Sequence, residues 1–341
     1  MPSFLSTSRL VLVAVVLSCG AAVWADEPDA PVRIVFDTDM GNDIDDALAL
    51  GVIHALQSRG ECELLAVTVS KDNAYCAPFV DLVNTFYGRG EVPIGVVRDG
   101  QTPEDSRYLT ETVGAADGGR RRFPHDLESG GDAPEAVDLL RQVLAAQPDS
   151  SVTMVQVGFS TNLARLLESA ADEHSPLAGR DLVARKCRLL SLMAGMFSET
   201  GRQREYNVFI DAPAAARVFA DWPTPIVASG FEIGQAIKYP AESIERDYGY
   251  VAHHPLAEAY ALYQQMPYDR ETWDLTSVLY AVRPDRGYFD LSPPGEIAID
   301  AEDITRFTPT AAGRCRYLIA TPEQATRVRE ALVQLASQPP G

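Results

Sequence analysis

The stretch Val32-Arg33-Ile34-Val35-Phe36-Asp37-Thr38-Asp39-Met40-Gly41-Asn42-Asp43-Ile44-Asp45-Asp46 decides the fold of this chain. Its first part, residues 32–36, is a short apolar run that is typical of a buried strand. The acidic residues that follow lead into residues 47–57, where apolar side chains recur at helical spacing. A second apolar run occupies residues 64–69. Strand, helix and strand in this order predict a βαβ unit with two parallel strands.

The alternation of strand-like and helix-like runs continues along the chain. It predicts further strands near 92–97, 152–157, 187–193, 224–229, 296–299 and 316–319, and further helices near 78–87, 134–146, 161–171, 213–220, 255–265, 275–281 and 322–336. Residues 99–132 are polar with little periodicity, which predicts a long loop. Repeated βαβ units predict an α/β fold with a mostly parallel open sheet, helices on both faces, and a single domain over residues 26–341.

Composition narrows the partners of this domain. The net charge is −19 over 341 residues, while the hydrophobic fraction of 46% is ordinary for a globular protein. Such a surface repels phosphate backbones and anionic membranes, so a nucleic-acid polymer is not an expected partner. Uncharged small molecules such as nucleosides are not excluded, and cations are favoured.

The N-terminus, residues 1–25, has the pattern of a signal peptide. Arg9 is its only charge, an apolar run covers residues 10–17, and Ala25 precedes the acidic Asp26. We therefore expect export to the periplasm or the extracellular space, and no other stretch is long enough to span a membrane. Cys19 follows a sequence that loosely resembles a lipoprotein cleavage box, so lipid anchoring is the alternative. The other four cysteines form no metal pattern and are expected to be buried free thiols.

Five aspartates lie within ten positions directly after the first predicted strand: Asp37, Asp39, Asp43, Asp45 and Asp46. Like charges so close raise one another's pKa, and a divalent cation removes this cost. Ligands that are all oxygen suit Ca²⁺ or Mg²⁺ rather than Zn²⁺. Helix capping is the simpler explanation for the last aspartates, but it does not account for Asp37 and Asp39 at the strand end. A metal site is therefore the favoured interpretation.

Two other acidic motifs share features with this run. An EF-hand loop does not fit, because Gly41 stands where a ligand is needed and Asn42 where the turn glycine belongs. Asp37-Thr38-Asp39 also resembles the nucleophile motif of haloacid dehalogenase-like phosphatases, although the usual continuation of that motif is missing. In such a phosphatase Asp37 would attack phosphorus.

Ligands of open α/β sheets bind outside the carboxyl ends of the strands, near the point where the strand order reverses. The residues that follow the predicted strands are therefore the informative ones. They occupy 37–46, 70–73, 157–162 and 193–198.

Four of these motifs resemble one family. Asp37-Thr38-Asp39 with Asp45-Asp46-Ala47 is similar to the signature Asp-x-Asp-Pro-Gly-x-Asp-Asp-Ala of the inosine–uridine-preferring nucleoside hydrolases, with Met in place of Pro and two residues inserted before the Asp pair. Residues 157–164 resemble that family's Thr-Gly-Pro-Leu-Thr-Asn segment, and Glu205-Tyr206-Asn207 its Glu-Phe-Asn segment. Trp273-Asp274 stands where the family has His-Asp. The motifs occur in the family's order along most of the chain after residue 25.

The resemblance implies a role for each matching residue. Ca²⁺ would be coordinated by the side chains of Asp39, Asp46 and Asp274 and by the backbone carbonyl of Val157. The hydroxyl groups of ribose would be bound by Asp45, Asn73 (with Asp72 as its alternative), Glu205 and Asn207. Asp37 would not bind the ion or the sugar itself but would orient the ligand residues or the turn that carries them.

The implied activity is calcium-dependent hydrolysis of the N-glycosidic bond of ribonucleosides to ribose and free base, as in nucleoside salvage, by a homo-oligomer. Asp39 would touch both metal and water and is the predicted general base; metal ligation alone is the simpler role for it. Cleavage passes through an oxocarbenium-like transition state, which nearby carboxylates stabilise.

Trp273 is the main departure from the family, because an indole cannot supply the proton that the family's His gives to the leaving base. The ring could stack on a base or be an ordinary core Trp. His125 and the pair His253-His254 are the candidate replacement acids. Three alternatives stay open: hydrolysis of another riboside, a haloacid dehalogenase-like phosphatase, and a non-catalytic ribose- or nucleoside-binding protein.

Overall fold

The computed structural model describes residues 30–198 and 203–341. The predicted signal peptide, residues 1–25, and Cys19 lie outside the described residues. Residues from Pro31 to Gly341 cluster into one unit, as expected for a single domain. Within the described part of the chain, no helix combines the length and the apolar character needed to cross a membrane.

The strand that decides the fold, β1 (Val32–Thr38), lies at the centre of the sheet. It pairs in parallel with β2 (Cys62–Lys71) on one side and with β6 (Val152–Gln156) on the other. Side chains of a strand alternate between its faces, and Ile34 and Phe36 enter one hydrophobic core while Val35 enters a second. Cores on both faces explain why the run is continuously apolar.

The sheet continues in both directions from β1. One side carries β2 and β3 (Ile94–Gln101), and the other carries β6, β7 (Cys187–Met193), β8 (Ile226–Ser229) and β14 (Cys315–Ile319), all parallel. Beyond β14 lie the antiparallel strands β12 (Gly295–Ile299) and β13 (Thr305–Pro309), and β11 (Asp290–Leu291) pairs with β14. The mostly parallel sheet is therefore confirmed, and its strand order reverses between β1 and β6.

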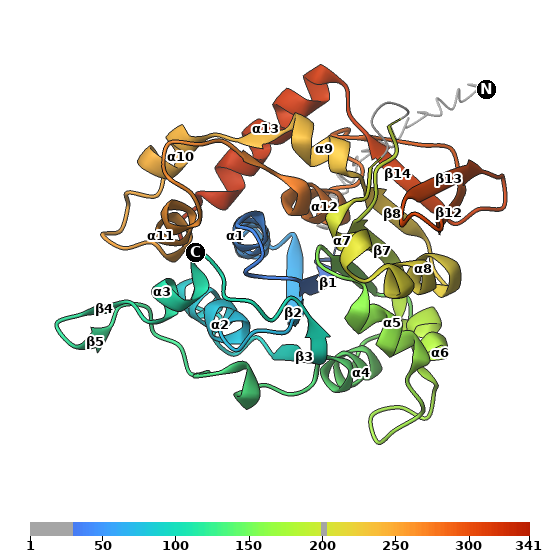
Figure 1. Ribbon diagram of the computed structural model, residues 1–341, viewed down its shortest axis with the longest axis horizontal. Coiled ribbons are helices and arrows are strands. Elements are labelled where there is room, and N and C mark those ends of the chain that lie inside the picture. The colour runs from blue at the N-terminus through green and yellow to red at the C-terminus, as the bar shows by residue number, and fades with distance from the viewer. Residues whose placement is uncertain (1–29, 199–202) are drawn as a thin grey trace, which may run out of the picture. The chain divides into compact units, whose positions relative to one another are not determined.

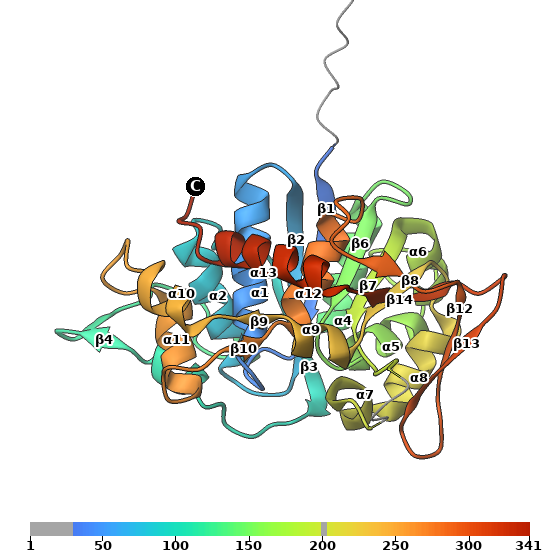
Figure 2. The same cartoon turned by 90° about the horizontal axis from the view of Figure 1, so that it is seen from above.

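Helices cover both faces of this sheet (Figures 1 and 2). One core contains residues of α1 (Asp45–Ser58), α2 (Cys76–Phe86), α12 (Trp273–Val282) and α13 (Pro322–Ala336). The other contains residues of α4 (Ala136–Ala146), α5 (Thr161–Glu168), α6 (Gly179–Lys186) and α8 (Ala212–Asp221). Shorter elements after β7 are α7 (Tyr206–Ile210), α9 (Phe231–Ala236), β9 (Lys238–Tyr239), α10 (Ala241–Arg246), α11 (Pro255–Tyr263) and β10 (Arg270–Glu271).

The region predicted as a long loop, 99–132, contains short elements of its own. These are α3 (Leu109–Val113), the hairpin of β4 (Ala116–Asp117) and β5 (Arg120–Arg121), and η1 (Gly130–Asp132). The prediction of a long loop did not include these short elements, because the segment is anchored by isolated side chains rather than by a periodic face. Tyr108 and Leu109 are fully buried, and the Tyr108 hydroxyl donates to the Asp43 carbonyl at 2.7 Å. The four cysteines are buried free thiols, as expected.

Candidate active site

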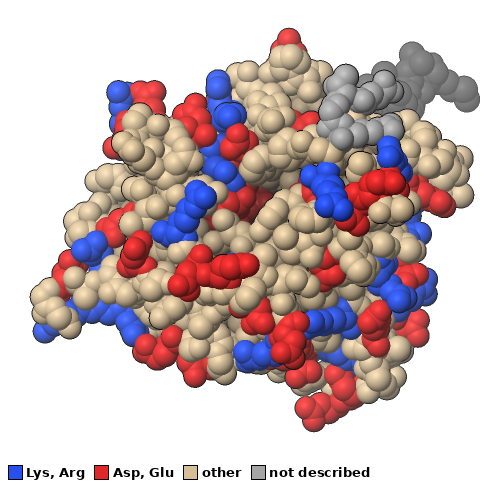
Figure 3. Space-filling model, in the orientation of Figure 1, with Lys and Arg blue, Asp and Glu red and all other residues tan. Residues whose placement is uncertain are grey.

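A pocket of about 270 Å³ opens beside the carboxyl ends of β1 and β6, where the strand order reverses. In the view of Figure 3, acidic atoms lie inside a hollow near the middle of the face shown. The pocket is lined by Asp39, Asp43, Val157, Met193, Glu205, Tyr206, Asn207, Phe231, Arg270, Trp273 and Asp274. The structure therefore brings together residues from four of the predicted motifs.

The acidic loop between β1 and α1 has a shape that only particular residues allow. Gly41 has φ +111°, a backbone conformation that L side chains rarely adopt, and a side chain there would overlap Leu109. Asp45 and Asp46 form the first turn of α1, where negative charge suits the helix dipole. Capping is thus part of the explanation for these two residues, but both carboxyls are also buried in the protein.

Asp37 lies behind the pocket and does not line it. It is fully buried, and its Oδ2 accepts hydrogen bonds from Thr68 Oγ1 at 2.6 Å and from Asn162 Nδ2 at 2.8 Å. Burial raises the pKa of Asp37 to about 7. These contacts favour a supporting role, and they tie the end of β1 to β2 and α5.

Four further aspartates are buried side by side, and we call them the acidic group: Asp39, Asp45, Asp46 and Asp274. Burial raises the pKa of Asp39 to about 7 and that of Asp45 to about 8. The pKa values of Asp46 and Asp274 rise well above 3.8, first through burial and then through the neighbouring carboxylates. Asp46 receives a short hydrogen bond from Thr38 on Oδ1, while its buried Oδ2 has no partner within residues 30–198 and 203–341.

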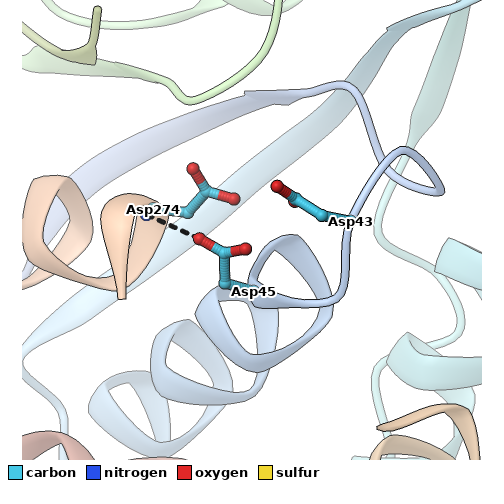
Figure 4. A group of neighbouring side chains, drawn as sticks. All are labelled: Asp43, Asp45 and Asp274. Atoms are coloured by element: carbon cyan, nitrogen blue, oxygen red, sulfur yellow. Dashed lines mark hydrogen bonds between the residues drawn. The ribbon is translucent and has the colours of Figure 1, made fainter. Parts of the chain in front are cut away.

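Arg270 supplies positive charge to one side of this acidic group. Its Nη2 lies 2.6 Å from Asp43 Oδ2 and 3.0 Å from Asp45 Oδ1. Ligand atoms of Asp43, Asp45 and Asp274 lie within 4.8 Å of one another and could hold a metal ion (Figure 4). Two of those three, Asp43 and Asp45, are already paired with the guanidinium, however. In the described part of the chain Asp39, Asp46 and Asp274 have no ion pair, so the charge balance favours them as ligands.

The acidic group fits a divalent cation. All its donors are oxygens, which suit Ca²⁺ or Mg²⁺, and the unpartnered Oδ2 of Asp46 is a buried acceptor that a cation would satisfy. Asp43 also lines the pocket, although the sequence interpretation left it without a role. Its position in the acidic run of the sequence is the signal that could have suggested a role. Its contact with Arg270 could not be found from local patterns, because the two residues lie 227 positions apart.

Val157 follows β6 and brings its backbone to the acidic group. Its N–H donates to the Asp37 carbonyl at 2.7 Å, and its own carbonyl accepts from Asn207 Nδ2 at 2.7 Å. A side chain on the next residue, Gly158, would overlap the backbone nitrogen of Asp39. The glycine therefore lets the chain after β6 pack directly against the chain after β1.

Glu205 and Asn207 also line the pocket. The Glu205 carboxylate caps α7, accepting from the backbone N–H groups of Asn207 at 2.9 Å, Val208 at 3.1 Å and Gly195 at 3.0 Å. Asn207 donates through Nδ2 to the carbonyls of Val157 and Met193, at 2.7 and 3.2 Å. Both residues thus hold the pocket in shape as well as lining it.

Asn73 and Asp72 do not line the pocket. Asn73 Nδ2 donates to the carbonyls of Pro103 and Glu104, each at 3.2 Å, and Asp72 Oδ2 accepts from the backbone of Gly100 at 2.9 Å. Asn42 instead contacts the acidic group, since its Nδ2 donates to Asp39 Oδ2 at 2.7 Å. Lys71 Nζ donates in turn to Asn42 Oδ1 at 3.0 Å.

Trp273 begins α12 and forms, with Phe231 and Arg270, what we call the aromatic wall of the pocket. Its Nε1 donates to the Phe231 carbonyl at 2.8 Å, and the two rings stack with centroids 5.2 Å apart. The Arg270 guanidinium lies 4.9 Å from the centre of the indole. The candidate acids His125, His253 and His254 do not line the pocket; Arg270 does, and sequence reasoning missed it.

An α/β protein with a carboxylate-rich pocket at the strand-order reversal is the class defined by fold and site. Residues 34–330 match the family model of the inosine-uridine preferring nucleoside hydrolases, and the chain belongs to that family. It is 28% identical over 219 residues to the inosine-uridine preferring nucleoside hydrolase of Leishmania major, covering 62% of this chain and 64% of that one. It is 30% identical over 225 residues to the pyrimidine-specific ribonucleoside hydrolase RihA of Shewanella sp. strain ANA-3, covering 62% and 63%.

These matched stretches span less than two thirds of the length of either relative. The likeness in structure is wider. An inosine-uridine preferring nucleoside hydrolase from Bacillus anthracis superimposes with a TM-score of 0.66 at 17% identity, covering 89% of this chain and 99% of that one. At this identity the comparison establishes the shared fold.

Proposed function

We propose that this protein hydrolyses the N-glycosidic bond of ribonucleosides to ribose and free base, with Ca²⁺ held by Asp39, Asp46, Asp274 and the Val157 carbonyl. The observation that carries the proposal is the group of buried carboxylates around the pocket, of which Asp39, Asp46 and Asp274 have no ion pair among the described residues. Leaving such charges buried and unpaired is costly, so they are retained for a bound cation and its substrate.

The ion, when bound, would chelate ribose hydroxyls and present a polarised water to the anomeric carbon. Asp39 would take the proton from that water. Its Oδ2 is held by Asn42 at 2.7 Å, which fixes the orientation of the carboxylate and leaves Oδ1 for water and metal.

The sugar would be gripped from two sides. Asp45 offers a carboxylate to the hydroxyls near the acidic group, and Asn207, whose Nδ2 is engaged by Val157 and Met193, offers Oδ1 to the 5′ side. Glu205 keeps α7 in position. Fixed carboxylates beside the ribose stabilise the positive charge that develops as the glycosidic bond breaks. Asn73 has no part in this proposal, because it does not line the pocket.

Reducing-sugar release from a panel of purine and pyrimidine nucleosides, with and without chelator, tests the proposal. We expect release in the presence of Ca²⁺, loss after chelation, and recovery when Ca²⁺ is restored. Nucleoside binding without any release would instead identify a binding protein. The absence of both release and binding with Ca²⁺ present would refute the proposal.

The rival phosphatase is disfavoured by the position of Asp37. A nucleophilic carboxylate must reach the substrate, whereas Asp37 is fully buried and does not line the pocket. Phosphate release from a phosphate ester, abolished by Asp37→Asn but not by Asp274→Ala, would reverse this preference.

Export through the segment 1–25 and assembly into a homo-oligomer also belong to the proposal. The supporting observation for export is the signal-peptide pattern of the sequence. The mass of the mature protein separates cleavage after Ala25 from lipid attachment at Cys19, and light scattering gives the number of subunits.

A further inference from the structure

Lys71 is a buried cation that has no ion pair within residues 30–198 and 203–341. It is the last residue of β2, and only 3% of it is exposed. Its Nζ donates to Asn42 Oδ1 at 3.0 Å and to the Thr102 carbonyl at 2.5 Å. Burying an ammonium without a carboxylate beside it is costly, so we looked for a role that offsets this cost.

Asn42 connects this ammonium to the acidic group. Its Nδ2 donates to Asp39 Oδ2 at 2.7 Å and to Thr102 Oγ1 at 3.3 Å, while its Oδ1 accepts from Lys71. A lysine ammonium can only donate hydrogen bonds, so the amide oxygen must face Lys71 and the amide nitrogen must face Asp39. The three residues therefore form a chain of hydrogen bonds with one possible direction, from Lys71 through Asn42 to Asp39.

We infer that Lys71 is a positioning residue that acts on Asp39 through Asn42, an inference that rests on the proposed function. The charged donor polarises the amide and strengthens its hydrogen bond to Asp39 Oδ2, since hydrogen bonds in a chain reinforce one another. Oδ2 is thereby held in place, which leaves Oδ1 for the cation and its water. An ammonium in direct contact with Asp39 would compete with the cation for the carboxylate, and the intervening amide avoids this competition.

Positioning and charge alone predict opposite changes in calcium affinity when Lys71 is removed. An ammonium that acted only by its charge would repel a divalent cation in the acidic group, so its removal would strengthen calcium binding. An ammonium that holds Asn42 against Asp39 keeps a ligand oriented, so its removal frees the carboxylate to rotate and weakens calcium binding. The sign of the change therefore separates the two roles.

The substitution Lys71→Met removes the ammonium and keeps an unbranched side chain. We expect the Kd for Ca²⁺ to rise about tenfold and kcat at saturating Ca²⁺ to fall about tenfold, the lower end of what the loss of a group behind a metal ligand costs. KM for the riboside should change less than about threefold. The fall in kcat should be equal for inosine and for p-nitrophenyl riboside, because p-nitrophenolate leaves as a stable anion and both reactions share the attack by water.

Lys186→Met is the matched control. The Lys186 ammonium also donates to a backbone carbonyl, that of Gln147 at 2.7 Å, and only 14% of its side chain is exposed. It lies on α6 and does not line the pocket, so the Kd for Ca²⁺ and kcat should stay at the wild-type values.

A double-mutant cycle tests whether Lys71 acts through Asn42. Asn42→Ala should weaken calcium binding and lower kcat at least as much as Lys71→Met, and the double variant should lose less than about twofold beyond Asn42→Ala. Lys71→Gln keeps N–H donors without the charge and should fall between wild type and Lys71→Met. It also takes the place of Lys71→Met in the cycle if that variant does not fold. Losses that multiply, or tighter calcium binding without Lys71, would overturn the inference.

Failure of the inference and failure of the proposed function give different results. A wild-type protein that binds Ca²⁺ but releases no ribose refutes the proposed function, and the Kd values of the same variants then still decide whether Lys71 positions Asp39. A wild-type protein that hydrolyses ribosides, with Lys71→Met equal to it in both Kd and kcat, overturns the inference and leaves the proposed function intact.

Discussion

The acidic group and the aromatic wall face the same pocket but are built in different ways. Three of the aspartates stand at the end of β1 or in the first turn of α1, so the central strand and its helix position them directly. The wall comes from the starts of α9 and α12 and from the two-residue strand β10. In the proposed function the sugar and the cation would therefore meet the central strand and its helix, whereas the base would meet the starts of peripheral elements.

Removing an acidic ligand should have the largest effect. Asp274→Ala should lower kcat/KM for every riboside at least about a thousandfold, because a bound metal supplies several kcal/mol of transition-state stabilisation. Asp290→Ala, at an exposed aspartate of β11, is the control. Calcium titration of both variants checks the cause, and retention of a tenth of the activity by Asp274→Ala would mean that this aspartate is not a ligand.

Separating the chain segments that follow β1 and β6, which pack together at Gly158 and Asp39, should have the second largest effect. Gly158→Ala places a methyl group against the Asp39 backbone, so the loops must move apart. A displacement of about 1 Å can cost about a hundredfold in rate, and we expect a loss of that order on all ribosides alike. Gly249→Ala, where a methyl group meets only an ordinary contact, should leave both activity and melting temperature unchanged. A normal rate in Gly158→Ala would show that the packing of Gly158 against the Asp39 backbone does not position the acidic group.

Without a cation, Asp37 and the acidic group should together make stability fall as pH rises. The pKa values of Asp37 and Asp39 are raised to about 7 and that of Asp45 to about 8, above the 3.8 of an ordinary aspartate. A raised pKa in the folded state means that the stabilisation is complete below about pH 4 and is lost as pH rises through 7 and 8. We expect the melting temperature of chelated protein to drop on the order of 5 °C between pH 5 and 8, and Ca²⁺ to remove most of the drop. An unchanged drop with Ca²⁺ would place the ion elsewhere.

The loss of one hydrogen bond within the aromatic wall should have the smallest effect. Trp273→Phe keeps a ring but loses the hydrogen bond from Nε1 to the Phe231 carbonyl, which is worth about 0.5–1.5 kcal/mol. We expect KM for inosine to rise about two- to tenfold, with p-nitrophenyl riboside nearly unaffected. Steady-state kinetics on the two substrates measure the difference. An equal change in both would contradict the separation between wall and acidic group.

The same contrast explains what could be predicted from the sequence. The run from Val32 to Asp46 contains its own strand, loop and helix start, so the central βαβ unit followed from local patterns. Arg270 could not be found in this way, because its contact with Asp45 spans 225 positions and depends on the pairing of β9 with β10. Asn73 was expected at the pocket by alignment with a family motif. In the structure Asn42 contacts Asp39 instead, whereas Asn73 does not line the pocket.

The most direct test of the central claim is a calcium titration of chelator-treated protein in which ribose release from inosine is followed at each step. The account predicts that binding and release saturate together with one Ca²⁺ per chain, and that Asp274→Ala abolishes both while Arg270→Lys retains the binding. Full ribose release from the calcium-free protein would contradict it.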